Sequence, residues 1–573
     1  MLLAGAAGTG KSTVIAAISA LFTLLNKSYN MTVCAYTGVA ANNVDGMTLH
    51  TALCLSNGVP KENSSARRDL IAMWSCVDYL IIDEFSMIGC RLLTQISEAL
   101  CIAKETSEPF GNINIIFAGD FMQLPPIGDR ALYQRLQPNS EGTTQGQTKI
   151  FGKLLWYTID VAVTLTETMH QRGNDANAFV DLLHRVRTGS TTIEDYAALN
   201  SRVLCEVDVL DRPDGFTTPI LVNTNSTKDE INTHATESFA EKTGRELHWY
   251  HSVDVVHKTV IGPGALKDRL NMVSGSSTQY KLGKMALVIG MPMMLVQNFD
   301  IAAGVVNGVI GTLQSLKYSL DDDQQRILKS VIIRTEDMKG DPIPGLQPQE
   351  FQVLQERSQA TVKSFYGGQD LHFTRSQVAI VPAFAMTVHK AQSRTLDRVI
   401  VDLKNTRTTA EAYVMLSRVR TFDQLFILRR FDWNNLKRSP PRDVRAEYHR
   451  QAQLPKHSTL SHAHAPSPAP EESTTDLHIP GYIPGPDRTT DIYQPFAQRV
   501  LNIQETNHPG PQEGPSEQRP ARRKVKLTTL EQYPILPPSP SQLSNSHVKR
   551  PPDSHTDDDQ PAPKRRKIKL SQN

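Results

Sequence analysis

Short apolar runs alternate with amphipathic stretches along the first 430 residues or so of the chain. Apolar runs typical of buried strands occupy residues 1–4, 31–37, 77–83 and 112–120. Helical patterns follow the first run to about residue 25 and the third run from about residue 86 to 104. Short buried strands that alternate with helices predict an α/β fold, with a parallel sheet covered on both faces.

A second α/β core follows the first. Residues 164–189 begin as a strand pattern and become a helix pattern, the segment PILVNTN predicts another strand, and α/β patterning returns over residues 378–430. Two irregular, β-rich runs lie between, at residues 245–315 and 330–375. They predict a small β-barrel inserted into the second core. Residues 136–149 are polar and glycine-rich, and they predict a surface loop.

Polar side chains stand where the predicted strands end. Thr37, Asp83 and Asp120 each end an apolar run, and a glycine-rich turn follows the first run. Ligands of parallel α/β sheets bind at the carboxyl ends of the strands. We therefore expect these groups to share one site.

The glycine-rich turn has the spacing of a phosphate-binding loop, G-x4-G-K-S. Glycine lets the backbone turn tightly and point its N–H groups inward, and the start of the next helix attracts anions. Lys11 can reach the β- and γ-phosphates, and the Ser12 hydroxyl suits Mg²⁺. The alternative is a glycine turn followed by an unrelated Lys-Ser pair. The nucleotide-binding residues that we predict are Gly5, Gly8, Gly10, Lys11, Ser12 and Thr13.

Asp83 and Glu84 follow an apolar strand, and this is the second half of a nucleotide site. One carboxylate can hold Mg²⁺, and the other can orient or deprotonate the attacking water. A surface acidic pair at a strand end is the alternative. Gln123, just past the next strand, is suited to sensing the γ-phosphate.

Composition limits the remaining classes. The chain has 573 residues and a formal net charge of +2, which predicts two to four domains and neither favours nor excludes nucleic acid. Six cysteines without a C-x-x-C pair are typical of a reduced intracellular protein without a zinc module. No apolar run reaches about 18 residues, so we expect no membrane contact.

The composition changes after about residue 436. Of the 35 prolines, 22 lie from Lys437 onward, among Ser, Gln and His. Such a segment cannot bury enough apolar surface to offset its ordering entropy, so residues 436–573 are predicted to be a disordered tail. Basic clusters at residues 522–526, 549–550 and 564–567 indicate a nuclear import receptor or nucleic acid as partner. A solvated run of charge remains the alternative.

The order of the motifs resembles that of the Pif-type (petite integration frequency) DNA helicases, in the RecD-like branch of superfamily 1. The similarity covers roughly residues 1–430. It rests on eight segments in the family's order: GAAGTGKS, TGVAANNVDGMTLH, LIIDEFSMIG, FAGDFMQLPPIG, LVNTN, GVVNGVIG, AFAMTVHKAQSRTL and AYVMLSRVR.

The resemblance implies two RecA-like cores with ATP between them. The first core would span residues 1–165, with a wedge at about 51–70, and the second 166–435, with a β-rich insertion at about 300–375. Glu84 would activate water, Asp83 and Ser12 would hold Mg²⁺, and Arg418 would act as an arginine finger from the second core. The positions that match the single-strand track are Thr37, Gly38, His50, His389 and Lys390.

The sequence departs from the family at several positions. The segment with the glutamine motif that reads adenine is missing before the phosphate-binding loop. His170 replaces an arginine expected at the γ-phosphate, and a neutral imidazole is a poor substitute for a guanidinium. Tyr36 stands where proline is common. Ser393 stands where many members have glycine, and a positive φ there would strain serine.

Three hypotheses follow. The first is an ATP-dependent 5′→3′ helicase that acts on single-stranded and forked DNA in repair, recombination or telomere maintenance, monomeric when unbound. The second is a weakened or truncated helicase remnant that binds nucleic acid with little turnover. The third is a P-loop switch that acts on protein partners. The basic tail predicts a nuclear location, or a mitochondrial one if a leader has been lost.

Overall fold

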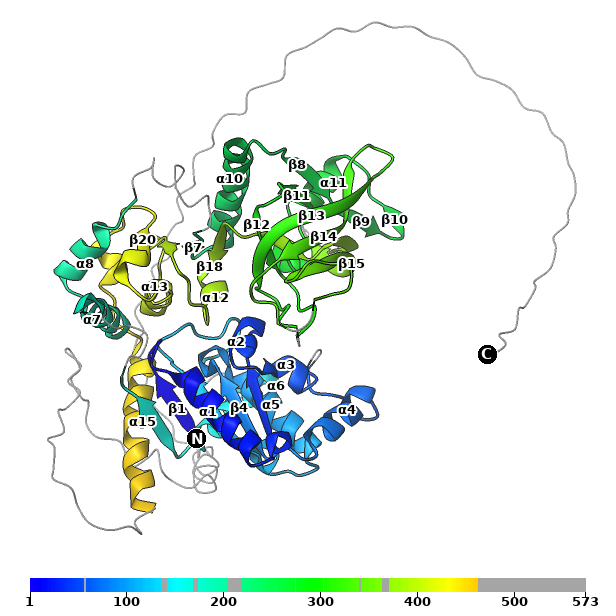
Figure 1. Ribbon diagram of the computed structural model, residues 1–573. Coiled ribbons are helices and arrows are strands. Elements are labelled where there is room, and N and C mark those ends of the chain that lie inside the picture. Colours follow the sequence, from blue (N-terminus) through cyan, green and yellow to red (C-terminus); the bar gives the residue numbers. More distant parts are fainter. Residues whose placement is uncertain are drawn as a thin grey trace, which may run out of the picture. The chain divides into compact units, whose positions relative to one another are not determined.

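The structure is a computed structural model. It describes residues 1–55, 58–135, 142–167, 174–204, 218–273, 275–301, 303–339, 342–362 and 370–461. These residues form two parallel sheets and a third sheet that is mostly antiparallel (Figure 1). The α/β prediction is therefore confirmed.

The first sheet has the strand order β3-β2-β4-β5-β1-β6, and all its pairs are parallel. Its strands are β1 (Leu2–Gly5), β2 (Met31–Ala35), β3 (Met47–Thr48), β4 (Tyr79–Asp83), β5 (Asn114–Gly119) and β6 (Ala162–Leu165). The helices of this core are α1 (Lys11–Leu24), α2 (Gly38–Asn43), α3 (Leu49–Ala52), α4 (Ser65–Trp74), α5 (Cys90–Ala103) and α6 (Thr144–Tyr157).

Neighbouring residues of each strand point to opposite faces of this sheet, and both faces are covered. Leu2 and Ile82 pack in the cluster that contains α5 and α6, whereas Leu3 and Ile81 pack with Ile15 of α1. Because both faces are buried, consecutive positions along a strand must be apolar. This explains the continuous apolar runs in the sequence.

The second sheet has the order β18-β7-β19-β20, again parallel. Its strands are β7 (Ile220–Val222), β18 (Ala385–Thr387), β19 (Val399–Val401) and β20 (Leu425–Ile427). The helices of this part of the chain are α7 (Asn174–Thr188), α8 (Ile193–Asn200), α10 (Asn225–Thr243), α12 (Val388–Ala391), α13 (Thr409–Leu416) and α14 (Trp433–Leu436).

A ten-stranded sheet is inserted between α10 and β18. It comprises β8 (His248–His251), β9 (Val253–Val256), β10 (Thr259–Val260), β11 (Lys284–Leu287), β12 (Pro292–Leu295), β13 (Ile310–Leu320), β14 (Arg326–Arg334), β15 (Glu350–Val362), β16 (Leu371–Val378) and β17 (Ile380–Pro382). The insertion thus begins about 50 residues before the predicted 300 and ends after the predicted 375. Within the described residues, the outer strands β10 and β17 do not pair with each other.

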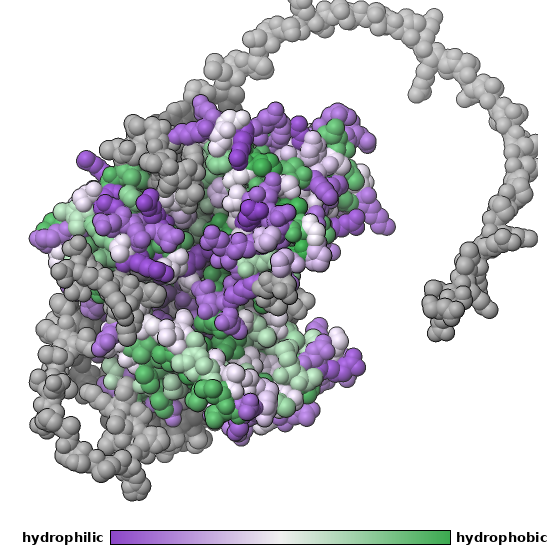
Figure 2. All heavy atoms as spheres, in the orientation of Figure 1, coloured by the Kyte–Doolittle hydropathy of each residue, from purple (hydrophilic) through white to green (hydrophobic). Residues whose placement is uncertain are grey.

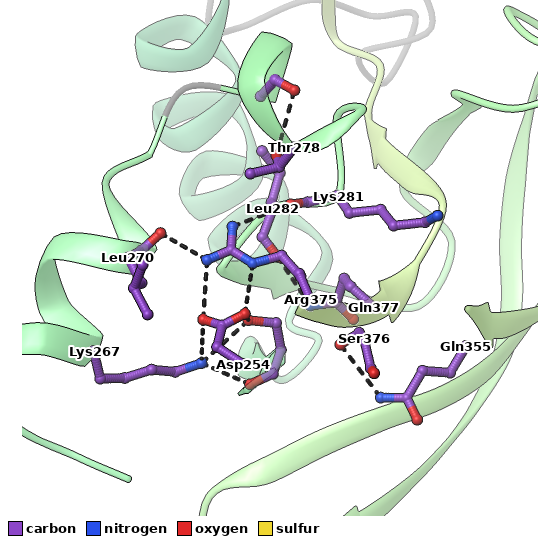
Figure 3. A network of polar contacts seen from close by, with 12 residues as sticks. Asp254, Lys267, Leu270, Thr278, Lys281, Leu282, Gln355, Arg375, Ser376 and Gln377 are labelled. Atoms are coloured by element: carbon purple, nitrogen blue, oxygen red, sulfur yellow. Dashed lines mark hydrogen bonds and ion pairs between the residues drawn. The ribbon is translucent and has the colours of Figure 1, made fainter. Parts of the chain in front are cut away.

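A buried ionic network fastens helix α11 (Ala265–Asn271) to this sheet (Figure 3). Asp254 of β9 is fully buried and accepts hydrogen bonds from Nε of Arg375 at 2.7 Å and from Nζ of Lys267 at 2.9 Å. Arg375 of β16 also donates to the carbonyl of Leu270 at 2.7 Å. One carboxylate therefore joins two strands and a helix.

The predicted boundary of the disordered tail is wrong. Helix α15 (Arg442–Ser461) lies beyond residue 436, and its Val444 and Leu454 belong to the apolar core of the first sheet. Nε1 of Trp156 in α6 donates to Oε1 of Glu447 at 2.8 Å. This amphipathic segment is rich in charge, which masked its few buried positions in the sequence. Residues 462–573, with the basic clusters, lie outside the described residues.

The predicted surface loop at residues 136–149 is also wrong at its end. Helix α6 begins at Thr144, and the side chain of Thr143 caps it by accepting a hydrogen bond from the N–H of Gly146 at 3.1 Å. The first turn of α6 is polar because it is largely exposed. Such a composition is typical of loops and of helix starts alike, so it could not distinguish them.

Hydrophobic residues are exposed at the carboxyl end of α1. Leu21, Leu24 and Leu25 are 52%, 80% and 58% exposed. Figure 2 shows hydrophobic residues gathered on the near face of the first core. In the described ranges, none of the helices combines the length and apolar content that crossing a membrane requires.

Candidate functional site

The turn between β1 and α1 is shaped to hold phosphate. Gly8 and Gly10 have φ values of 80° and 86°, which side-chain-bearing residues rarely adopt. A Cβ on Gly5 would lie 2.5 Å from Oγ1 of Thr9, so this position also requires glycine. Nζ of Lys11 donates to the carbonyls of Gly5 and Ala6 at 2.8 and 2.9 Å. A bound phosphate would have to replace these acceptors.

A cavity of about 190 Å³ joins this loop to the second core. From the first core it is lined by Ala7, Gly8, Gly10, Lys11, Ser12, Thr13, Asn43, Asp83, Glu84 and Gln123, and from the second part of the chain by Leu183, Ser393, Arg394, Thr395, Ser417, Arg418, Val419 and Arg420. The structure therefore brings together all predicted nucleotide-site residues except Gly5, which is buried at the end of β1.

Asp83 and Ser12 fit a divalent cation in this cavity. Burial and the neighbouring charge of Glu84 raise the pKa of Asp83 to about 7, against the opposing effects of the Glu84 N–H and of Lys11. A buried carboxylate and a hydroxyl are donors that Mg²⁺ accepts. The described residues contain no cluster of three or more His, Cys, Asp and Glu that could hold a metal ion alone. Phosphate oxygens would have to complete the coordination shell.

Glu84 is held from the second core through both carboxylate oxygens. Nε2 of Gln392 donates to Oε2 at 3.0 Å, and Oγ of Ser393 donates to Oε1 at 2.8 Å. Glu84 is 9% exposed and Gln392 is 3% exposed. The φ of Ser393 is 66°, which confirms the positive φ expected at this position.

Arg418, the predicted arginine finger, lines the cavity but is bound by its own core. It is 4% exposed. Nε donates to the carbonyl of Val414 at 2.7 Å, and one terminal nitrogen donates to the carbonyl of Arg394 at 3.1 Å. Burial lowers the pKa of Arg418, and the charge of Glu84 opposes that shift. The guanidinium would have to exchange some of these partners to contact a terminal phosphate.

Gln123 has an unused acceptor at the cavity. It is 3% exposed, and its Oε1 has no hydrogen-bond partner among the described residues. A buried polar atom without a partner is costly unless a ligand or water satisfies it. The unpaired Oε1 can accept a hydrogen bond from a water in the cavity, whereas the predicted contact of Gln123 with the γ-phosphate would need its Nε2, because phosphate oxygens accept.

Asp120, which we expected at the shared site, does not line the cavity but belongs to a buried cluster beside it, and the sequence did not identify the partners in that cluster. Asp120, at the end of β5, is 1% exposed and accepts two hydrogen bonds from Arg187 of α7, at 2.9 and 3.0 Å. The hydroxyl of Tyr448 in α15 also contacts Asp120. Burial alone would raise the pKa of Asp120, but Arg187 and these hydrogen bonds together lower it.

A second contact missed in the sequence connects the phosphate-binding loop with α13. The N–H of Ala7 donates to the hydroxyl of Tyr413 at 2.8 Å. Tyr413 lies within the segment AYVMLSRVR, and this is the signal that could have identified it. Arg187 had no such signal, because a single arginine in an amphipathic helix carries no motif.

Three residues predicted for the single-strand track, Thr37, Gly38 and His50, lie at α2 and α3 of the first core. Thr37 caps α2 by accepting a hydrogen bond from the N–H of Ala40 at 3.2 Å. Gly38 is buried, and a Cβ there would lie 2.9 Å from Val306 of the insertion, so it serves close packing. His50 is exposed, and its ring lies edge-on to that of Tyr36, with 6.1 Å between the two ring centroids.

The other two predicted track residues, His389 and Lys390, lie on α12, directly after strand β18 of the second sheet. Nζ of Lys390 donates to Oδ1 of Asn307 in the insertion at 2.6 Å. Burial, with Arg394 and Lys228 adding to it, lowers the pKa of Lys390 to about 8. The predicted departure at His170 lies outside the described residues, as do the neighbouring positions 168–173.

Comparisons with known proteins agree with this arrangement. The sequence model of the family described as PIF1-like helicase matches residues 1–197. The ATP-dependent DNA helicase PIF1 of Xenopus laevis is 27% identical over 428 residues, which cover 74% of this chain and 58% of that protein. The chain thus spans a little more than half the length of this curated relative.

Solved structures show the same fold. The crystal structure of the Pif1 helicase from Candida albicans has a TM-score of 0.57 and 25% identity, and the match covers 79% of this chain and 95% of that one. A Bacteroides Pif1 in complex with ADP-AlF3 and ssDNA has a TM-score of 0.56 and 21% identity, with coverage of 81% and 94%. In its ordered motifs, its two parallel sheets and these matches, the chain is similar to the PIF1-like helicases, whose family model it matches over residues 1–197.

Proposed function

We propose that this chain is an ATP-dependent DNA helicase that moves 5′→3′ on single-stranded DNA and unwinds duplex. The observation that carries the proposal is the shared cavity. Lys11, Asp83 and Glu84 line it from the first core, and Arg418 lines it from the second. A nucleotide held there would touch both cores, so its hydrolysis could change how they are joined.

The side chains suit phosphoryl transfer. Lys11 would release the carbonyls of its own loop and bind the β- and γ-phosphates instead. Gln123 would orient the attacking water. Glu84 would accept the proton of that water, and Arg418 would stabilise the charge that develops on the phosphate oxygens. Ser12 and Asp83 would hold Mg²⁺, which neutralises phosphate charge when it is bound.

The proposed substrate is single-stranded and forked DNA. What supports this choice is the relatives: a Bacteroides Pif1 binds ssDNA, and another solved structure concerns unwinding of forked dsDNA by two coordinating Pif1 helicases. Thr37, His389 and Lys390 would contact the strand, and backbone contact with base stacking would suffice without sequence preference. We further propose a role in repair, recombination or telomere maintenance, a monomer when unbound, and nuclear import through the basic tail.

The test is ATP hydrolysis by the purified protein with and without oligo-dT. We expect DNA to stimulate hydrolysis, Lys11→Ala to abolish it, and the exposed Lys27→Ala to leave it unchanged. A forked duplex with a free 5′ tail should be unwound, and one with only a free 3′ tail should not. If the folded protein hydrolyses ATP at the same rate with and without DNA, the proposed helicase function is wrong.

A second candidate is a DNA-binding relative with little turnover. It is favoured by one observation, that both oxygens of Glu84 are already engaged by the second core. It predicts salt-sensitive binding of oligo-dT with negligible hydrolysis, and a gain of hydrolysis in His170→Arg. Rapid hydrolysis that His170→Arg leaves unchanged would exclude this candidate.

A further inference from the structure

The turn after α12 connects the proposed catalytic carboxylate with the proposed DNA track. Gln392 and Ser393 donate to the two oxygens of Glu84, at 3.0 and 2.8 Å. Lys390, two residues earlier, donates to Asn307 of the insertion. A strand phosphate bound at Lys390 would compete with that partner. A displacement of α12 at Lys390 would therefore also move Gln392, two residues further along the chain, and with it the contact to Glu84.

Both ends of this contact have a strained backbone. Ser393 has a φ of 66° and Glu84 a φ of 56°, and both lie in the left-handed region that favours glycine. Residues other than glycine persist there only where the surrounding structure imposes the conformation. The two strained residues are joined directly by the Ser393–Glu84 hydrogen bond, so opening that bond would also allow the strain to relax.

The same turn is held by further contacts from both sides. Nδ2 of Asn43, in α2 of the first core, donates to the carbonyl of Ser393 at 2.6 Å. Arg418 donates to the carbonyls of Ala391 and Arg394, at 3.4 and 3.1 Å. A shift of the turn would thus free Glu84 and break two of the hydrogen bonds of Arg418 together, while Arg418 keeps its bond to Val414.

Gln392 is incompletely satisfied in this arrangement. Its Nε2 is shared between Glu84 and Oγ of Ser86, at 3.0 and 3.3 Å, while its Oε1 is buried without a hydrogen-bond partner among the described residues. An unpaired buried acceptor raises the free energy of this conformation. The contact is therefore suited to exchange with a second arrangement.

We propose that Gln392 and Ser393 are positioning residues that restrain Glu84 until DNA occupies the track. The inference rests on the proposed function and adds its regulation. In the restrained arrangement, the carboxylate is oriented by the second core and not by the attacking water. DNA bound at α12 moves the turn, the two donors withdraw, and Glu84 becomes free to accept the proton of that water.

The experiment removes one donor at a time. Ser393→Ala deletes the hydroxyl, and Ser393→Gly deletes it and also accepts the positive φ without strain, so that at least one variant folds. We expect both to raise kcat for ATP hydrolysis without DNA about three- to tenfold, the worth of one hydrogen bond. At saturating oligo-dT, kcat should change less than twofold. Gln349→Gly, which relieves a φ of 64° on an exposed position of the insertion, controls for strain and should change neither rate.

A binding measurement separates this inference from the proposed function. In the wild type, oligo-dT should change the Kd of a fluorescent ADP analogue, because the turn couples the two sites. In Ser393→Ala, that effect should shrink at least about threefold. A DNA-free kcat that is unchanged or lower, or an unchanged coupling, would overturn the restraint. If the wild type does not hydrolyse ATP but oligo-dT still changes the Kd of the ADP analogue, the helicase proposal is wrong while the connection between the two sites stands.

Discussion

Asp120 shows how much one residue beside the cavity depends on its partner. Its carboxylate is 1% exposed, and Arg187 supplies two hydrogen bonds and the compensating charge. Desolvation of a lone carboxylate is costly, so loss of Arg187 leaves a charge that water cannot reach. The pair also joins the first core to α7, which precedes the second sheet.

Removing Arg187 should destabilise the protein strongly. We expect Arg187→Met to lower the free energy of unfolding by about 3–5 kcal/mol, the range for breaking a buried ion pair. Arg135→Met is the control for an exposed ion pair. Arg135 pairs with Asp443, and the two side chains are 85% and 30% exposed, so the loss should be about 1 kcal/mol or less. Urea titrations followed by tryptophan fluorescence measure both, and equal losses would contradict the assignment.

The same pair predicts an acid dependence. The pKa of Asp120 in the folded protein lies below its ordinary value of 3.8, so the pair stabilises fully above that value and its contribution is lost as pH falls through the lower folded pKa. The wild type should therefore keep this contribution from pH 5 to 7 and lose it only in stronger acid. In Arg187→Met, burial alone raises the pKa of Asp120, so the variant should regain stability as pH falls from 7, and the difference from wild type should shrink. A difference that stays constant from pH 7 down to pH 4 would point to another group.

Arg418 should act on turnover and not on nucleotide binding. Arg418→Lys keeps a charge at the cavity but loses the planar fork that can contact two phosphate oxygens. If Arg418 is the arginine finger, kcat should fall by about 10³-fold or more, while the Kd of a fluorescent ADP analogue changes little. Steady-state hydrolysis and fluorescence titration give the two numbers. A modest fall in kcat would remove Arg418 from the catalytic groups.

At the scale of elements, the inserted sheet depends on one buried carboxylate for the attachment of α11. Asp254 compensates both Arg375 and Lys267, and all three are 5% exposed or less at the side chain (Figure 3). Burial alone would raise the pKa of Asp254, but the two cations lower it. Loss of its charge would leave two cations buried together.

Asp254→Asn should therefore detach α11 before it affects the nucleotide site. We expect a loss of about 3–5 kcal/mol within the insertion, seen as faster hydrogen exchange in residues 261–283. Asp268→Asn, an exposed change on the same helix, should leave exchange unaltered. Unchanged protection of α11 in Asp254→Asn would show that apolar packing suffices to hold it.

The sequence predicted those elements whose pattern is local. The strands of the first sheet were evident because burial on both faces requires continuous apolar residues, as Leu80, Ile81 and Ile82 show. Gly10, Lys11 and Asp83 were evident because their chemistry depends on spacing in the chain. Helix α15 was missed because its few buried positions contact a surface made some 300 residues earlier, and no local pattern reports such a contact.

At the scale of the whole molecule, α15 returns the end of the described chain to its beginning. Val444 and Leu454 complete the core of the first sheet, and Glu447 accepts a hydrogen bond from the buried Trp156. Tyr448 contacts Asp120 and Arg187, so one helix touches the first core and α7 together. The segment after residue 436 is therefore part of the folded unit as far as its helix extends.

Truncation should reveal this directly. A chain that ends after residue 461 should keep the thermal stability of the full protein, because the contacts of α15 are intact. A chain that ends after residue 440 loses Val444 and Glu447, and it should unfold at a temperature lower by several degrees. Differential scanning calorimetry compares the two with the full chain. Equal stability of both shortened chains would show that α15 adds nothing.

The position of α15 also has a consequence for biosynthesis. Ribosomes release a polypeptide from its amino end, and domains made early generally begin to fold early. Here the earliest lobe cannot seal its interior around Trp156 until residues near 450 have left the exit tunnel. During most of translation that lobe would expose an unfinished apolar surface, which makes it a candidate for chaperone protection until the last helix docks.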